Sequence, residues 1–183
     1  MDRPNRTQVP PLRPAVRIKI ISVGEPAVGK SCLIKRYCEQ RFVSKYVATI
    51  GVDYGVKPIK IRGTEVRVNF WDLAGGEEYA EIRNEFYKDA QGGILVFDVN
   101  SRQSFEALGF WRKEATALGA GGAQFVLCGN KSDVGKRVVS ADEGQKFAAL
   151  HGLPYFETTA KDGDNVTEMF HALFARVVEK IDL

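Results

Sequence analysis

The residues best suited to chemistry lie in one segment, GEPAVGKS at residues 24–31, which fits the pattern G-x-x-x-x-G-K-[ST]. Glycines at its two ends let the backbone wrap closely around a polyphosphate, because a Cβ would obstruct that approach. Backbone N–H groups at the start of the following helix would then meet phosphate oxygens. Lys30 can reach the β- and γ-phosphates, and the Ser31 hydroxyl can bind Mg²⁺. The residues predicted to contact the nucleotide here are Gly24, Ala27, Val28, Gly29, Lys30, Ser31 and Cys32.

The stretches on either side of this segment support the interpretation. Residues 16–23 form a β-branched run typical of a buried strand, and residues 32–37 have apolar residues at helical spacing. From average composition, a chance match to the pattern has a probability below roughly one per cent in a chain of this length. The sequence therefore predicts a nucleotide-phosphate site in a strand–loop–helix unit.

Strand and helix signals alternate along the rest of the chain. A hairpin is expected from residues 56–61 and 65–71, and continuous apolar runs at 93–99 and 124–129 are typical of central strands in a parallel sheet. This pattern predicts an α/β fold of the P-loop NTPase kind, with a doubly wound, mostly parallel six-stranded sheet flanked by helices. Ligands of such sheets bind at the carboxyl ends of the strands. A short strand is expected at 153–156, and helices at 104–118, 141–150 and 165–181.

Size and composition favour one ordinary globular domain. The chain has 183 residues and a net charge of +3, which is too small to indicate a nucleic-acid partner. Its three cysteines form no C-x-x-C pair, so we expect free thiols in a reducing compartment. No apolar stretch approaches the roughly 18 residues of a membrane-spanning helix. Residues 1–15, rich in proline and arginine, are expected to be a disordered basic tail, and residues 16–183 the nucleotide-binding domain.

A second motif, Asn130-Lys131-Ser132-Asp133, predicts that the base is guanine. An ionised Asp133 only accepts hydrogen bonds, and guanine offers N1–H and N2–H₂ side by side, whereas adenine lacks that donor pair. Asn130 can tie this loop to the phosphate loop, and the stem of Lys131 can cover the base. An ATP-using P-loop kinase is therefore disfavoured. Backbone N–H groups after the last short strand could meet guanine O6, and the residues that supply them are Thr159, Ala160 and Lys161.

Two further segments are placed to sense a γ-phosphate. Asp72 follows an expected strand and can bind Mg²⁺ through water, and the Gly75 N–H can contact the γ-phosphate. Thr49 lies in a loop between the first helix and the hairpin, where its hydroxyl can complete the Mg²⁺ shell once a γ-phosphate draws the loop inward. The metal ligands predicted are therefore Ser31, Thr49 and Asp72. Two loops held by one phosphate group would make an order–disorder switch.

With these motifs in place, the chain resembles a small GTPase of the Ras superfamily over residues 16–183. Residues 50–54, IGVDY, resemble the segment that marks the Rab branch. Residues 36–46 and 84–89 are similar to the RJL group, which are Rab-like GTPases of which some carry a C-terminal J domain. The sequence shows no J domain, so we expect a member without one or a chain truncated before it.

The resemblance implies that the cofactors are GTP or GDP with Mg²⁺. It also implies roles for further residues. Phe42 matches the aromatic residue that packs on guanine, and Tyr46 the tyrosine that closes over the phosphates. A hydrophobic patch for effector proteins is implied around Ile50, Tyr54 and Trp71, with an aromatic residue from 86–87; ordinary core packing is the alternative. Exchange factor and activator are unidentified. We expect a cytoplasmic monomer without a lipid anchor, and the group also points to a ciliary or partner-recruited membrane pool.

Two departures from the superfamily pattern bear on catalysis. Gly76 stands where most members have the glutamine that orients the attacking water, and Pro26 stands where Ras proteins have glycine. The residues assigned to catalysis are Lys30, Thr49, Gly75 and Gly76. Because Ras alone hydrolyses GTP at only about 3–5 × 10⁻⁴ s⁻¹, losing this glutamine predicts a GTP state that lasts hours. The alternative is a constitutively GTP-bound scaffold that never cycles; hydrolysis and exchange rates separate the two hypotheses.

Overall fold

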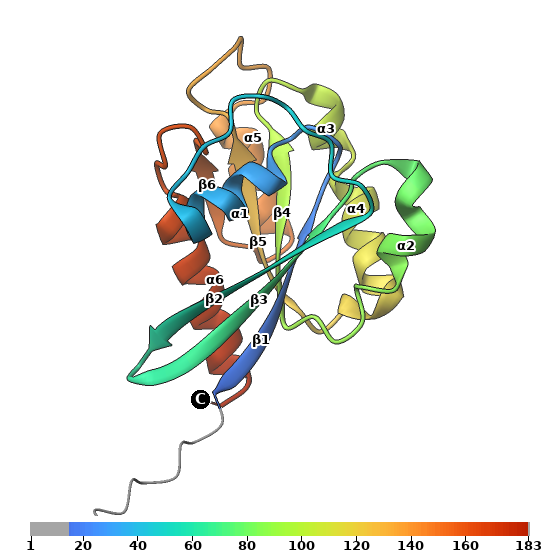
Figure 1. Cartoon of the computed structure of the whole chain (residues 1–183). Coiled ribbons are helices and arrows are strands. Elements are labelled where there is room, and N and C mark those ends of the chain that lie inside the picture. The colour runs from blue at the N-terminus through green and yellow to red at the C-terminus, as the bar shows by residue number, and fades with distance from the viewer. Residues whose placement is uncertain (1–14, 183) are drawn as a thin grey trace, which may run out of the picture.

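The computed structural model describes residues 15–182 and is built around a six-stranded sheet (Figure 1). The strand order is β2-β3-β1-β4-β5-β6, and only the β2–β3 pair is antiparallel. The loop after β1 therefore opens at the carboxyl edge of four further parallel strands. The strands are β1 (Val16–Val23), β2 (Val52–Ile61), β3 (Thr64–Leu73), β4 (Gly92–Asp98), β5 (Gln124–Asn130) and β6 (Tyr155–Thr158).

Helices cover both faces of the sheet, as a doubly wound topology requires. One core lies between the sheet and α1 and α6, and the other between the sheet and α3, α4 and α5. Figure 1 shows α6 along one side of the sheet and α2 and α4 on the other. The helices are α1 (Lys30–Glu39), α2 (Ala80–Asn84), α3 (Arg102–Glu106), α4 (Leu108–Ala115), α5 (Ala141–Leu150) and α6 (Val166–Lys180), with a 3₁₀ turn η1 (Glu77–Tyr79) before α2.

Local sequence explains where these elements begin. The apolar runs of β4 and β5 lie at the centre of the sheet, where helices cover both faces. Helix α5 begins at a capping box, in which the Ser140 hydroxyl accepts from the Glu143 N–H and the Glu143 carboxylate accepts from the Ser140 N–H. The apolar strands and the capping box thus fix the position of the elements that are joined by the loops at the carboxyl edge of the sheet.

The predicted fold class is confirmed, and the differences concern element boundaries. Both hairpin strands are longer than expected, and the last strand starts at Tyr155 and includes Thr158. The single helix expected over 104–118 is divided into α3, α4 and a wide turn at 116–120, where Gly119 adopts φ +105°. The tail expected at 1–15 lies outside the described residues except for Ala15. Among the described residues, no helix has the length and apolarity to cross a membrane.

Replacing Phe170 by alanine tests the packing that α6 provides. Its ring is fully buried, 4.7 Å from the ring of Tyr37 and 5.5 Å from that of Phe70 between centroids. We expect Phe170→Ala to lower the free energy of unfolding by about 3–5 kcal/mol, measured by urea denaturation, because it leaves a cavity. The control is Leu150→Ala, at a side chain that is 80% exposed. It should change the free energy of unfolding by less than about 0.5 kcal/mol.

Candidate nucleotide-binding site

The loop after β1 folds as a cradle for an anion. Gly24 adopts φ +144°, and a Cβ there would collide with the backbone carbonyl of Val96. Gly29 adopts φ +99° and precedes α1, so both end positions of the motif require glycine. The first turn of α1 directs its N–H groups into this cradle. The structural reason for the two glycines is thus their positive φ and the protein atoms that a Cβ would meet. Those atoms are the Val96 carbonyl at Gly24 and the Asn130 side chain at Gly29; close approach to a polyphosphate stays a prediction.

Lys30 is held inside the loop by the backbone carbonyls around it. Its ammonium donates to the carbonyl oxygens of Gly24 and Glu25, at 2.9 Å each, and the residue is only 6% exposed. Burial lowers the pKa of Lys30 to about 8, and the negative charge of Asp72 opposes this shift. A buried ammonium of this kind gains most from a charged partner, so the site favours an anion beside Lys30.

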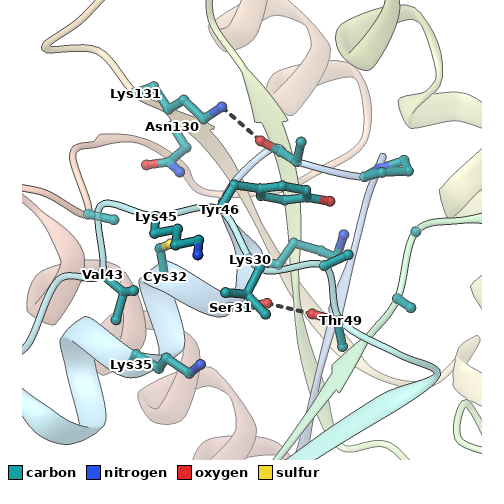
Figure 2. A pocket seen from close by; sticks show the side chains of 18 of the residues that line it. Lys30, Ser31, Cys32, Lys35, Val43, Lys45, Tyr46, Thr49, Asn130 and Lys131 are labelled. Atoms are coloured by element: carbon teal, nitrogen blue, oxygen red, sulfur yellow. Dashed lines mark hydrogen bonds between the residues drawn. The ribbon is translucent and has the colours of Figure 1, made fainter.

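Three oxygen-bearing side chains converge next to this lysine. The hydroxyls of Ser31 and Thr49 lie 2.8 Å apart, Ser31 donates to the Asp72 carboxylate, and Thr49 lies 3.4 Å from the same carboxylate oxygen. The Ser22 hydroxyl donates to the other oxygen of Asp72 at 2.6 Å and fixes its orientation. Hydroxyl and carboxylate oxygens suit Mg²⁺, so the three predicted metal ligands are brought together and fit the ion. Figure 2 shows the Ser31–Thr49 contact.

The Asn130 motif ties the base end of the site to the phosphate loop. The Asn130 amide donates to the Val28 carbonyl at 2.9 Å and accepts from the Thr158 hydroxyl at 3.0 Å. Lys131 donates to the Ala27 carbonyl at 2.7 Å (Figure 2) and also pairs with Asp98 at 2.8 Å. These contacts fix the loop at 130–133 against the loop at 24–31. The expected link between the two loops is therefore present.

A cavity of about 300 Å³ runs between these two ends. Four predicted residues do not line it: Gly24, Val28, Asp72, whose carboxylate accepts from the Ser31 hydroxyl, and Thr159, whose hydroxyl accepts from the Asp162 N–H. The other predicted residues line the cavity. Among them are Phe42 and Tyr46, which the resemblance assigned to contacts with the base and with the phosphates. The full set is Ala27, Gly29, Lys30, Ser31, Cys32, Phe42, Tyr46, Thr49, Gly75, Gly76, Asn130, Lys131, Asp133, Ala160 and Lys161.

Sequence reasoning missed several residues of this site. Lys35 on α1 and Lys45 in the loop above it also line the cavity, and Figure 2 shows their side chains beside the phosphate-loop residues. No motif marks either lysine. Ser22, by contrast, had a signal, because it is the one hydroxyl in an otherwise apolar stretch of its strand.

Gly76 has an ordinary extended backbone, with φ −69° and ψ 144°, that any side chain can adopt. A Cβ placed there would lie 2.6 Å from the carboxylate carbon of Glu78, which itself lines the cavity. Glu78 is exposed, so the end of its flexible side chain can move aside. The missing glutamine is therefore not excluded by the fold.

The aromatic patch expected for effectors is formed by three rings. Tyr54 lies 4.5 Å from Trp71, and Trp71 lies 4.9 Å from Phe86, between ring centroids. Tyr87 is fully buried, so Phe86 supplies the third ring. Tyr54 is 49% exposed and Ile50 is 80% exposed. Core packing, the alternative interpretation, applies fully to Tyr87 and in part to Trp71 and Phe86, which are half-buried against the core, but not to Tyr54 or Ile50.

Comparison with known proteins agrees with this geometry. The model of the Ras family matches residues 19–179. The chain belongs to the Ras family.

Several curated proteins that are similar to this chain are named DnaJ homolog subfamily C member 27. The protein from Homo sapiens is 50% identical over 171 residues, covering 90% of this chain and 63% of that protein. The protein from Danio rerio is 48% identical with the same coverage, and that from Gallus gallus is 48% identical over 93% of this chain and 64% of that protein. The chain thus spans less than two-thirds of the length of these relatives. Their DnaJ name confirms the predicted resemblance to the RJL group.

Asp133→Asn tests the assignment of the base pocket. The substitution replaces an acceptor by an amide that opposes the guanine donors, and hydrogen bonds to charged groups contribute about 1.5–3 kcal/mol. We expect the Kd for GDP, measured by titration with a fluorescent GDP, to rise about 10- to 100-fold. Asp142→Asn on the exposed face of α5 is the control. Unchanged GDP affinity in Asp133→Asn would remove Asp133 from the base pocket.

Proposed function

We propose that this protein is a guanine-nucleotide switch that binds GTP and GDP with Mg²⁺ and hydrolyses GTP very slowly. Membership of the Ras family supports nucleotide binding in general. The observation that carries the proposal is the convergence of Ser31, Thr49 and Asp72 beside Lys30, at one end of a cavity whose other end holds Asp133. This arrangement suits a magnesium-bound polyphosphate joined to guanine.

Mg²⁺ would neutralise charge on the β- and γ-phosphates, and the chain itself supplies the remaining functions. Lys30 and the N–H groups at the start of α1 bind the phosphates. The Gly75 N–H would donate to the γ-phosphate, and the Thr49 hydroxyl would bind the metal. Pro26 lacks an N–H and adds no donor to the loop.

Slow hydrolysis follows from the absence of a water-orienting side chain at Gly76. Gly76 has no donor or acceptor beyond its backbone, and its carbonyl is already engaged by Arg83 at 2.9 Å. Each 1.4 kcal/mol of lost transition-state stabilisation slows the reaction about tenfold. The GTP state would then persist, and the output of the protein would be effector binding through Ile50, Tyr54, Trp71 and Phe86. A cytoplasmic pool recruited by partners is the localisation we propose.

Gly76→Gln tests this mechanism by single-turnover hydrolysis of GTP on protein loaded with GTP and Mg²⁺. We expect the wild type to hold GTP for hours and Gly76→Gln to be at least about tenfold faster, because the new carboxamide can orient the water. Gly76→Ala is the matched control, since it displaces Glu78 equally but adds no polar group. A wild-type rate equal to that of Ras, about 3–5 × 10⁻⁴ s⁻¹, or equal rates in the two variants, would contradict the proposal.

A further inference from the structure

Glu25 places a carboxylate in a loop that is otherwise suited to bind anions. It lies between Gly24 and Pro26, next to the N–H groups at the start of α1 and the ammonium of Lys30. Burial lowers the pKa of Lys30, and the negative charges of Asp72 and, less strongly, Glu25 oppose this shift, so the carboxylate is within electrostatic reach of the ammonium. A carboxylate on the loop itself would compete with a phosphate at a high effective concentration.

The backbone of Glu25 is held in place on both sides. Its carbonyl accepts from the Lys30 ammonium at 2.9 Å. The preceding residue, Gly24, packs against the Val96 carbonyl so closely that a Cβ there would lie 2.3 Å from the oxygen. The side-chain torsions of Glu25, and not its backbone, therefore decide where the carboxylate lies.

Helix α4 binds this carboxylate outside the nucleotide cavity. The indole N–H of Trp111 donates to the Glu25 carboxylate at 2.9 Å, across 86 positions of sequence. Trp111 is 2% exposed and belongs to the core between the sheet and α3, α4 and α5. Glu25 does not line the cavity, although Pro26 and Lys30 do. A rigid, buried donor thus holds the one acidic side chain of residues 24–31 beside the core.

We propose that Trp111 is a positioning residue that keeps the Glu25 carboxylate out of the phosphate site. The proposal rests on the proposed function and adds to it a residue on α4 that no motif marks. Among the described residues, the indole is the only hydrogen-bond donor to this carboxylate. Without it, the carboxylate would turn to Lys30, occupy the ammonium and repel the β- and γ-phosphates. If the loop is then free about one-tenth of the time, the apparent affinity for either nucleotide falls about tenfold.

The test is a double-mutant cycle with Trp111→Phe and Glu25→Gln, read out as the Kd for a fluorescent GDP and for GTPγS with Mg²⁺. Trp111→Phe keeps an aromatic ring and removes the donor, and we expect both Kd values to rise about tenfold. In the Glu25→Gln background, the same replacement should change them by less than about twofold, because an uncharged carboxamide does not compete with phosphate.

The cycle separates positioning from packing, because Trp111→Phe leaves the same cavity in the core with and without the carboxylate. The control is Phe110→Leu, at the neighbouring ring of α4, which is 56% exposed and has no hydrogen bond to the phosphate loop. It should leave both Kd values unchanged. An equal loss of affinity in the two backgrounds, or no loss in Trp111→Phe, would overturn the proposal.

Hydrogen exchange of the Trp111 indole N–H, followed by ¹H–¹⁵N NMR, provides a second test that keeps this side chain intact. We expect exchange in Glu25→Ala to be about 10- to 100-fold faster than in the wild type, because the bond to a charged acceptor is lost. Equal exchange rates would overturn the role of Trp111 while leaving the switch intact. Failure of the wild type to bind either nucleotide would instead overturn the proposed function, and this inference with it.

Discussion

Backbone packing against backbone is the constraint on which the rest of the site depends. Gly24 leaves no space for a Cβ beside the carbonyl of Val96 on β4, and Gly75 leaves none beside the carbonyl of Gly24. Three segments far apart in sequence therefore meet without side chains between them. This contact sets the distance between the phosphate loop and the turn after β3, and with it the position where Ser31 and Asp72 meet.

Sequence reasoning predicted the parts of the site that are set by backbone and motif. The strand before the loop matches β1 at both ends, and α5 has the predicted bounds. Ser31 and Asp72 were predicted because one begins a helix and the other ends a strand at the carboxyl edge of the sheet, where the topology brings such ends together. Thr49, in contrast, was predicted from its place in the loop before the hairpin. Thr159 was assigned to the base pocket through its backbone N–H, but it does not line the cavity, and that N–H donates to the Asp164 carbonyl at 3.3 Å in a turn that propensity does not specify.

The sequence could not reveal contacts that depend on side-chain direction over long separations. Arg83 and Glu114 both resemble ordinary exposed charges on helices, and only the packing of α2 against α4 makes them a buried pair. Phe86 and Tyr87 are adjacent aromatic residues, and the path of the chain after α2 decides which one is fully buried. The division of residues 102–120 into α3, α4 and a wide turn follows from tertiary packing and from Gly119, not from apolar periodicity.

The exposed patch and the buried pair together bear on how a signal would leave the protein. Trp71 is on β3, and Phe86 follows α2, whose Arg83 is anchored to α4. Tyr54 is on β2, paired with β3 through its whole length. These three rings thus lie on paired strands and on the segment after α2, whereas Ile50 belongs to the loop whose Thr49 contacts Ser31 and Asp72. The proposed effector surface would therefore combine three rings on the strands and on the segment after α2 with Ile50, which comes from the loop that carries Thr49.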